Sequence, residues 1–126
     1  MRRGAAAVEA APALVGARFR LHGRDPATGL DCVGVGAAAI GCEAIGDYGV
    51  RMGDADRAAG RIAAAGLSRV AEGLPGDVVL MRSGPGQLHL GILTPGGMVH
   101  ADAGLRRVVE RPGAPPWPVI GWFRGE

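Results

Sequence analysis

The chain has 126 residues, a length that fits one domain spanning 1–126, and its 48% hydrophobic and 21% charged residues are typical of a folded globular protein. A net charge of +2 with dispersed arginines excludes the basic footprint of a nucleic-acid-binding protein. No apolar run is long enough to span a bilayer, and Glu9 and Pro12 interrupt the N-terminal apolar stretch, so we expect neither a membrane span nor a signal peptide.

The first half of the chain has the pattern of helices separated by loops. Apolar residues recur at helical spacing, and Asp54 is placed to cap the third of these segments. Pro12 makes the first segment irregular. The predicted helices cover residues 5–16, 32–45 and 55–65, and the predicted loops cover 17–31 and 46–53.

After Gly73 the sequence changes to short apolar runs separated by turns rich in glycine and proline. This pattern is typical of an antiparallel meander. Helices followed by strands indicate the α+β class, with N-terminal helices packed on a C-terminal antiparallel sheet of about five strands. The predicted strands cover residues 77–82, 87–94, 98–102, 105–110 and 118–123.

Asp31 and Cys32 stand at the start of the second predicted helix, directly after the turn residue Gly29. Asp31 can cap this helix, and Cys32 then lies in the first turn, where the helix dipole favours a nucleophilic thiolate. Most free cysteines are instead small buried apolar residues, and the position alone does not decide between these roles. Cys32 and Cys42 are ten residues apart, about 15 Å along one helix, which is too far for a disulfide.

His89 and His100 lie on neighbouring predicted strands, on the two sides of the turn 94–97. A four-residue turn pairs Ile92 with Val99 and makes the two histidines diagonal neighbours on one face of the sheet. Glycine at position 91, opposite His100, leaves room beside the pair. The residues expected on this face are His89, Gly91, His100 and Asp102.

Two histidines and a carboxylate on one face are typical of a metal site or of a catalytic base with a residue that orients it. Cys32, His89 and His100 could supply three zinc ligands, but the chain has no closely spaced ligand pair of the kind that zinc sites usually show. A cysteine at a helix start, a histidine and a polar partner for that histidine fit nucleophilic catalysis better. We therefore expect catalysis without a metal or another cofactor.

Three short motifs occur in order along the chain. The first is a loop from Phe19 that ends in Gly29-Leu30-Asp31-Cys32, the second is Pro75-Gly76-Asp77 with a strand and then His89-Leu90-Gly91-Ile92, and the third is Val99-His100-Ala101. These motifs resemble those of the NlpC/p-sixty family of cell-wall cysteine peptidases. Each motif is weak by itself, but the three occur in the family's order and spacing and together cover nearly the whole chain.

The resemblance implies a papain-like fold in which Cys32 is the nucleophile, His89 the general base and His100 the residue that orients the base. It also implies hydrolysis of amide bonds in peptidoglycan stem peptides, usually between D-glutamate and a diamino acid. The short form is similar to peptidases of phage or gene-transfer-agent tail clusters. Stem peptides and phage-like tail proteins are thus the implied partners, and the cell wall or periplasm is the implied place of action after synthesis in the cytoplasm.

The chain departs from the family pattern near the expected site. Phe19 stands where the family has a tyrosine, and His22 stands at a usual glycine position, either as a polar group of the site or as a solvated loop residue. Asp102 is an alternative or additional partner for His89. We expect the substrate-binding residues to be Phe19, His22, Asp31 and Asp102.

Three other classes of protein stay open from the sequence. A thiol amidase or acyltransferase on the same fold would act on a different acyl substrate. A phage-tail assembly or cell-wall binding module would keep the pocket without turnover. A zinc-binding domain would use the cysteine and the histidines as ligands, and metal analysis of the purified protein decides that case.

Overall fold

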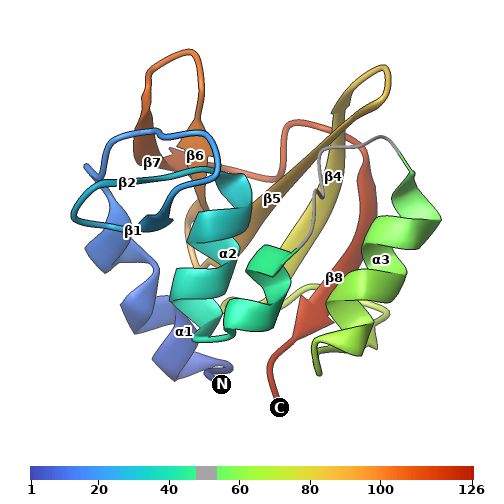
Figure 1. The fold of residues 1–126 in the computed structure, drawn as a ribbon. Coiled ribbons are helices and arrows are strands. Elements are labelled where there is room, and N and C mark those ends of the chain that lie inside the picture. Colours follow the sequence, from blue (N-terminus) through green and yellow to red (C-terminus); the bar gives the residue numbers. More distant parts are fainter. Residues whose placement is uncertain (48–53) are drawn as a thin grey trace.

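The computed structural model describes residues 1–47 and 54–126, and it places the helices on one face of a twisted antiparallel sheet (Figure 1). The helical elements are α1 (Ala5–Ala10), the 3-10 turn η1 (Pro12–Leu14), α2 (Cys32–Ile40), the 3-10 turn η2 (Glu43–Asp47) and α3 (Ala55–Ala64). The strands are β1 (Arg24–Asp25), β2 (Gly29–Leu30), β3 (Ser68–Val70), β4 (Val78–Gly84), β5 (Gln87–Thr94), β6 (Gly97–Asp102), β7 (Arg107–Pro112) and β8 (Val119–Arg124).

The main sheet has six strands in the order β3-β8-β4-β5-β6-β7, and every neighbouring pair is antiparallel. Strands β4 to β7 follow one another as hairpins, and β8 returns to pair with β4 on its other side. The predicted α+β arrangement, with N-terminal helices on a C-terminal antiparallel sheet, is therefore confirmed.

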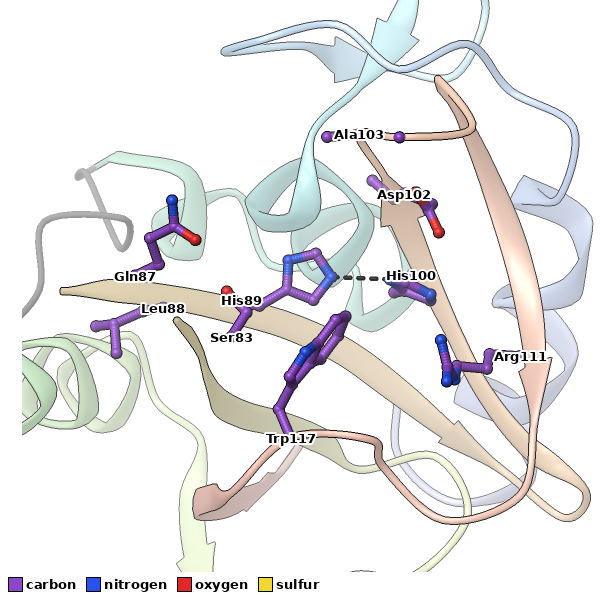
Figure 2. Close-up of a pocket in the computed structure, with 11 residues that line it drawn as sticks. Ser83, Gln87, Leu88, His89, His100, Asp102, Ala103, Arg111 and Trp117 are labelled. Atoms are coloured by element: carbon purple, nitrogen blue, oxygen red, sulfur yellow. Dashed lines mark hydrogen bonds between the residues drawn. The ribbon is translucent and has the colours of Figure 1, made fainter. Parts of the chain in front are cut away.

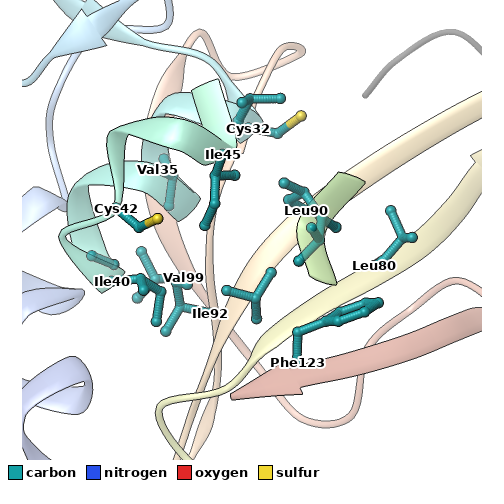
Figure 3. Packing of buried hydrophobic residues seen from close by; sticks show 14 of the residues in the cluster. Cys32, Val35, Ile40, Cys42, Ile45, Leu80, Leu90, Ile92, Val99 and Phe123 are labelled. Carbon is teal, nitrogen blue, oxygen red and sulfur yellow. The ribbon is translucent and has the colours of Figure 1, made fainter. Parts of the chain in front are cut away.

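The principal core lies between α2 and the middle of the sheet, because α2 packs against β5 and β6. Leu90 and Ile92 of β5 belong to this core, and since side chains alternate along a strand, His89 and Gly91 face the other way. Burial of each large aliphatic side chain contributes about 1.5–3 kcal/mol. Further core residues labelled in Figure 3 are Val35, Ile40, Ile45, Leu80, Val99 and Phe123.

The opposite face of the sheet carries a second, smaller apolar cluster, which the sequence analysis did not predict. Its buried members are Val79, Met81 and Met98. Trp117, from the connection between β7 and β8, packs against this cluster together with Trp122 of β8. The face on which His89 and His100 lie is thus partly covered rather than open.

The first two helices are shorter than predicted. After α1 the chain continues as a 3-10 turn that begins at Pro12, because proline has no N–H to continue the helical bonding. Helix α2 ends at Ile40, where Gly41 adopts a left-handed conformation with φ of 73° and donates its N–H to the carbonyl of Ala37. Cys42 therefore lies beyond the helix that was predicted to contain it.

The strand predictions need three corrections. The predicted strand 105–110 is observed as β7 at 107–112. Residues 103–106 form a turn instead, in which the Asp102 side chain accepts the N–H of Leu105. The predicted loop 17–31 contains the two-residue strands β1 and β2. The edge strand β3 was missed, so the main sheet has six strands rather than about five.

The third helix agrees with its prediction. Asp54 caps it by accepting the N–H of Arg57 at 3.0 Å. Residues 48–53 of the predicted loop lie outside the described residues. Among the residues that the structure describes, no helix is long and apolar enough to cross a membrane.

Candidate active site

Cys32 is the first residue of α2, and Asp31 is its N-cap, as predicted. Asp31 has extended backbone, and its Oδ1 accepts the N–H of Gly34 at 2.8 Å. Figure 3 shows Cys32 at the start of the helix with its sulfur directed away from the helix. The side chain is 2% exposed, so the groups packed around it, together with the positive end of the helix dipole, decide its reactivity.

The carboxylate of Asp31 also ties the preceding loop to the helix. It accepts the backbone N–H of His22 at 2.9 Å and pairs with Arg24 Nη1 at 2.7 Å. The residue is 2% exposed, so these donors offset the cost of burying its charge. A Cβ on Gly34 would collide with the carbonyl of Gly23, because the backbone of the preceding loop packs closely against α2 there.

The two histidines meet as the strand register predicted. Ile92 pairs with Val99, and His89 Nε2 lies 2.8 Å from His100 Nδ1 (Figure 2). The ring planes are 84° apart, with 5.0 Å between their centroids. The room beside Gly91 is filled by the side chain of Met98 rather than left for His100, which corrects that part of the prediction.

His100 is 1% exposed, and its surroundings shift its pKa. Burial lowers its pKa, Asp102 raises it, and Arg111 lowers it, with a downward shift as the result. A neutral imidazole can accept a hydrogen bond at Nδ1 from the N–H of His89 Nε2, and its own proton is then on Nε2. That Nε2 atom is buried and makes no hydrogen bond within the described part of the chain.

Trp117 covers the histidine pair and was missed by the sequence analysis. Its ring meets His89 at 5.2 Å and 74°, and His100 at 5.9 Å and 78° (Figure 2). An aromatic ring here excludes water from the His89–His100 hydrogen bond, which strengthens it electrostatically. The feature of the sequence that could have indicated this residue is a tryptophan between Pro116 and Pro118, in a segment with no periodicity.

The histidine pair opens onto a cavity of about 450 Å³. Ser83 and Gln87 line it from the β4–β5 hairpin, and Asp102 and Arg111 line it from β6 and β7. This volume is in the range of small-ligand and peptide sites. Among its lining residues, the sequence analysis had not singled out Ser83, Gln87, Arg111 or Trp117.

No protein-family model matches the sequence, and no curated protein matches it. Among solved structures, that of NlpC1 from Trichomonas vaginalis matches with a TM-score of 0.68 at 20% sequence identity. The fold is NlpC-like. The match covers 99% of this chain and 46% of the neighbour, so the chain spans about half of the neighbour's length. At this identity the likeness establishes the fold, and it confirms the predicted papain-like α+β architecture.

Within this NlpC-like fold, the predicted substrate-binding residues divide into two groups. Asp102 lines the cavity, whereas Phe19 is half-buried against the core and His22 is an exposed loop residue with φ of 61°. Asp31 is occupied with the loop and the helix cap and does not line the cavity. Substrate contacts by Phe19, His22 and Asp31 remain predictions.

His100, rather than Asp102, is the residue hydrogen-bonded to His89. The Asp102 carboxylate accepts the N–H of Leu105 at 3.0 Å and influences His100 through its charge. Among the residues that the structure describes, no group of three or more His, Cys, Asp or Glu side chains is arranged to hold a metal ion.

Asp77, the last residue of the Pro-Gly-Asp motif, has a structural position in the NlpC-like fold. It is 1% exposed, accepts two bonds from Arg124 at 2.9 and 2.8 Å, and accepts the N–H of Leu74. These bonds join the start of β4 to the end of β8. The motif thereby fixes the start of β4 against β8, and from β4 the chain continues into the hairpin that carries the histidines.

Proposed function

We propose that this chain is a cysteine peptidase that hydrolyses amide bonds in peptidoglycan stem peptides. Cys32 is the nucleophile, His89 the general base and His100 the residue that orients the base. The observation that carries the proposal is the 2.8 Å hydrogen bond between His89 and His100, set in a cavity of an NlpC-like fold whose α2 begins at Cys32.

The first step is proton transfer from the Cys32 thiol to Nδ1 of His89, which gives a thiolate and an imidazolium. His89 Nε2–H then donates to Nδ1 of His100, so the new positive charge is shared with a neutral acceptor. The lowered pKa of His100, caused mainly by its burial, supports this role because a charged His100 could not accept.

The thiolate then attacks the amide carbonyl, and backbone N–H groups of the first turn of α2 stabilise the oxyanion. The C–N bond breaks as His89 passes its proton to the leaving amine, which leaves a thioester on Cys32. His89 next takes a proton from water, whose oxygen attacks the thioester. The C–S bond breaks, the acid leaves, and the proton returns to the sulfur.

The substrate class rests on the three motifs that resemble the NlpC/p-sixty family. The proposed bond is that between D-glutamate and a diamino acid, and the cavity volume suits a peptide of this size. We propose the cell wall or periplasm as the place of action, reached in association with phage-like tail proteins.

The first experiment is a titration of Cys32 reactivity against pH in the wild-type chain and in His89→Ala. A thiolate that forms well below pH 8.5, about the ordinary value for a thiol, and that requires His89 supports the catalytic pair. An inert Cys32 in both proteins would favour a binding module instead.

Digestion of stem peptides by Cys32→Ala and Cys42→Ala tests the reaction itself. Cys42 is also buried, at 9% exposed, but lies after the end of α2, where its Sγ contacts the carbonyl of Ala65. We expect Cys32→Ala to abolish hydrolysis and Cys42→Ala to retain it. Full activity of Cys32→Ala would exclude the scheme, and an acyl-enzyme formed only with other acyl compounds would indicate an amidase or acyltransferase.

A further inference from the structure

Arg111 presents a positive charge to the cavity beside the histidine pair. It lies on β7 directly opposite Met98 of β6, and therefore on the face of the sheet that carries His100, two residues further along β6. Figure 2 shows its side chain reaching from β7 toward the histidines. The residue is exposed and lines the cavity, so a ligand can reach its guanidinium from solvent.

Three other arginines of the chain have partners within the fold. Arg24 pairs with the buried Asp31, Arg124 pairs with the buried Asp77, and Arg2 donates to the carbonyl of Ala38. In contrast, the Arg111 side chain takes part in no ion pair or hydrogen bond with the residues in 1–47 and 54–126. Its charge lowers the pKa of His100 and is not otherwise paired within the described part of the protein.

Asp102 is the carboxylate that shares the cavity with Arg111, and it is too distant to neutralise the guanidinium. Asp102 lies four residues along β6 from Met98, the partner of Arg111, which corresponds to about 13 Å. Asp102 also accepts the N–H of Leu105. The two charges therefore lie on the two sides of His100, and that of Arg111 is available to a ligand.

We propose that Arg111 is a specificity-determining residue that binds a carboxylate of the substrate. This inference rests on the proposed function and deepens it, because it names a chemical group that the peptide must carry. The planar guanidinium matches a carboxylate through two parallel hydrogen bonds. A stem peptide offers two sources of this group, the α-carboxylate of the D-glutamyl residue and the carboxylate of the diamino acid.

Binding to the Cys32→Ala chain separates recognition from turnover. The probe is L-alanyl-γ-D-glutamyl-L-lysine, compared with the same peptide amidated at the glutamyl α-carboxyl and with the peptide amidated at the lysine carboxyl. The dissociation constants are measured by calorimetry with Arg111 intact, with Arg111→Met and with Arg111→Lys. Arg107→Met is the matched control, because Arg107 is exposed on the same strand but does not line the cavity.

We expect Arg111→Met to weaken binding of the unmodified peptide about tenfold, Arg111→Lys to weaken it less, and Arg107→Met to leave it unchanged. One of the two amidated peptides should bind the chain with Arg111 intact as weakly as the unmodified peptide binds Arg111→Met. The dissociation constant of that amidated peptide should not change in Arg111→Met. The peptide that behaves so identifies the source of the carboxylate.

Three results would overturn the inference: equal effects of Arg111→Met and Arg107→Met, equal sensitivity of all three peptides to Arg111→Met, or no measurable binding of the unmodified peptide. Hydrolysis by the chain with Cys32 present reports separately on the proposed function. Carboxylate-dependent binding without hydrolysis retains the role of Arg111 and rejects the peptidase. If all three peptides are hydrolysed equally, both with Arg111 intact and in Arg111→Met, the proposed peptidase function is supported and the proposed role of Arg111 is rejected.

Discussion

His89 Nε2 and His100 Nδ1 lie 2.8 Å apart across the β5–β6 hairpin, with the two ring planes 84° apart in a T-shaped arrangement. This bond engages Nε2 of the His89 ring and fixes the ring orientation, so in the proposed mechanism Nδ1 is the nitrogen that exchanges a proton with the Cys32 thiol. The two residues reach this geometry because the turn places Ile92 opposite Val99. A shift of one residue in that register would separate them onto opposite faces.

Removal of the hydrogen bond between His89 and His100 should reduce turnover strongly. On the proposed mechanism, we expect His100→Ala to lower kcat for stem-peptide hydrolysis roughly 100-fold, because the proposed base, His89, loses its orientation and the acceptor for its second N–H. His100→Asn should retain more activity, since the amide oxygen can accept the same hydrogen bond. Steady-state kinetics of the two variants measure the difference.

Asp102→Asn is the matched control for this prediction. Asp102 lines the same cavity but is not the hydrogen-bond partner of His89. Its substitution should change kcat much less than His100→Ala does. A larger loss in Asp102→Asn than in His100→Ala would assign the orienting role to the carboxylate.

The stability of the fold should fall as the pH drops below about 6.5. The pKa of His100 is lowered in the folded chain, mainly by burial, so in this range the unfolded chain binds a proton that the folded chain does not. Because unfolding takes up a proton, the free energy of unfolding increases with pH through this range. At higher pH, His100 is neutral in both the folded and the unfolded chain. Urea unfolding at pH 5 and at pH 7.5 measures the effect.

A histidine substitution isolates the contribution of His100 from those of other titrating groups. His100→Gln should have a smaller difference in stability between the two pH values than the wild-type chain has. His22→Gln, at an exposed loop position, should keep the wild-type difference. The same pH dependence in wild type and His100→Gln would contradict the linkage.

The features predicted correctly from the sequence depend on local chemistry. Asp31 caps α2, and Asp54 caps α3, because a short acidic side chain before an apolar periodic segment satisfies the first-turn N–H groups. The register of the histidine hairpin followed from the length of one turn between two alternating strands. In both cases the decisive contacts join residues close together in the sequence.

The features that were missed depend on contacts between distant segments. Strand β3 is three residues long, mostly exposed and without an apolar pattern, and it exists as a strand because it pairs with β8 some fifty residues later. Trp117 lies over the histidines because β8 returns beside β4 and carries the preceding connection across the sheet. Neither placement leaves a periodic signal in the sequence.

Loss of the Trp117 ring should expose the histidine pair to water. We expect Trp117→Ala to lower kcat/KM about tenfold, because water competes for the His89–His100 hydrogen bond. Trp117→Phe keeps an aromatic cover and should lose less. Trp122→Ala is the control, because Trp122 packs on the same apolar cluster but does not meet the histidine rings.

Thermal unfolding of the three variants separates stability from catalysis. Trp117→Ala and Trp122→Ala should both unfold at lower temperature, since each removes apolar surface from the cluster on the outer face of the sheet. The drop in kcat/KM, measured below the unfolding transition, should occur in Trp117→Ala alone. Equal losses of activity in the two variants would mean that Trp117 contributes packing only.

Replacement of the buried cap should destabilise the fold strongly. Asp31→Ala removes the acceptor for Gly34 and the ion pair with Arg24, so we expect a loss of about 2–4 kcal/mol in the free energy of unfolding. Asp54→Ala, at an exposed cap that accepts one N–H, should cost about 1 kcal/mol or less. Urea unfolding at neutral pH measures both, and equal costs would contradict the view that the Asp31 carboxylate joins the loop to α2.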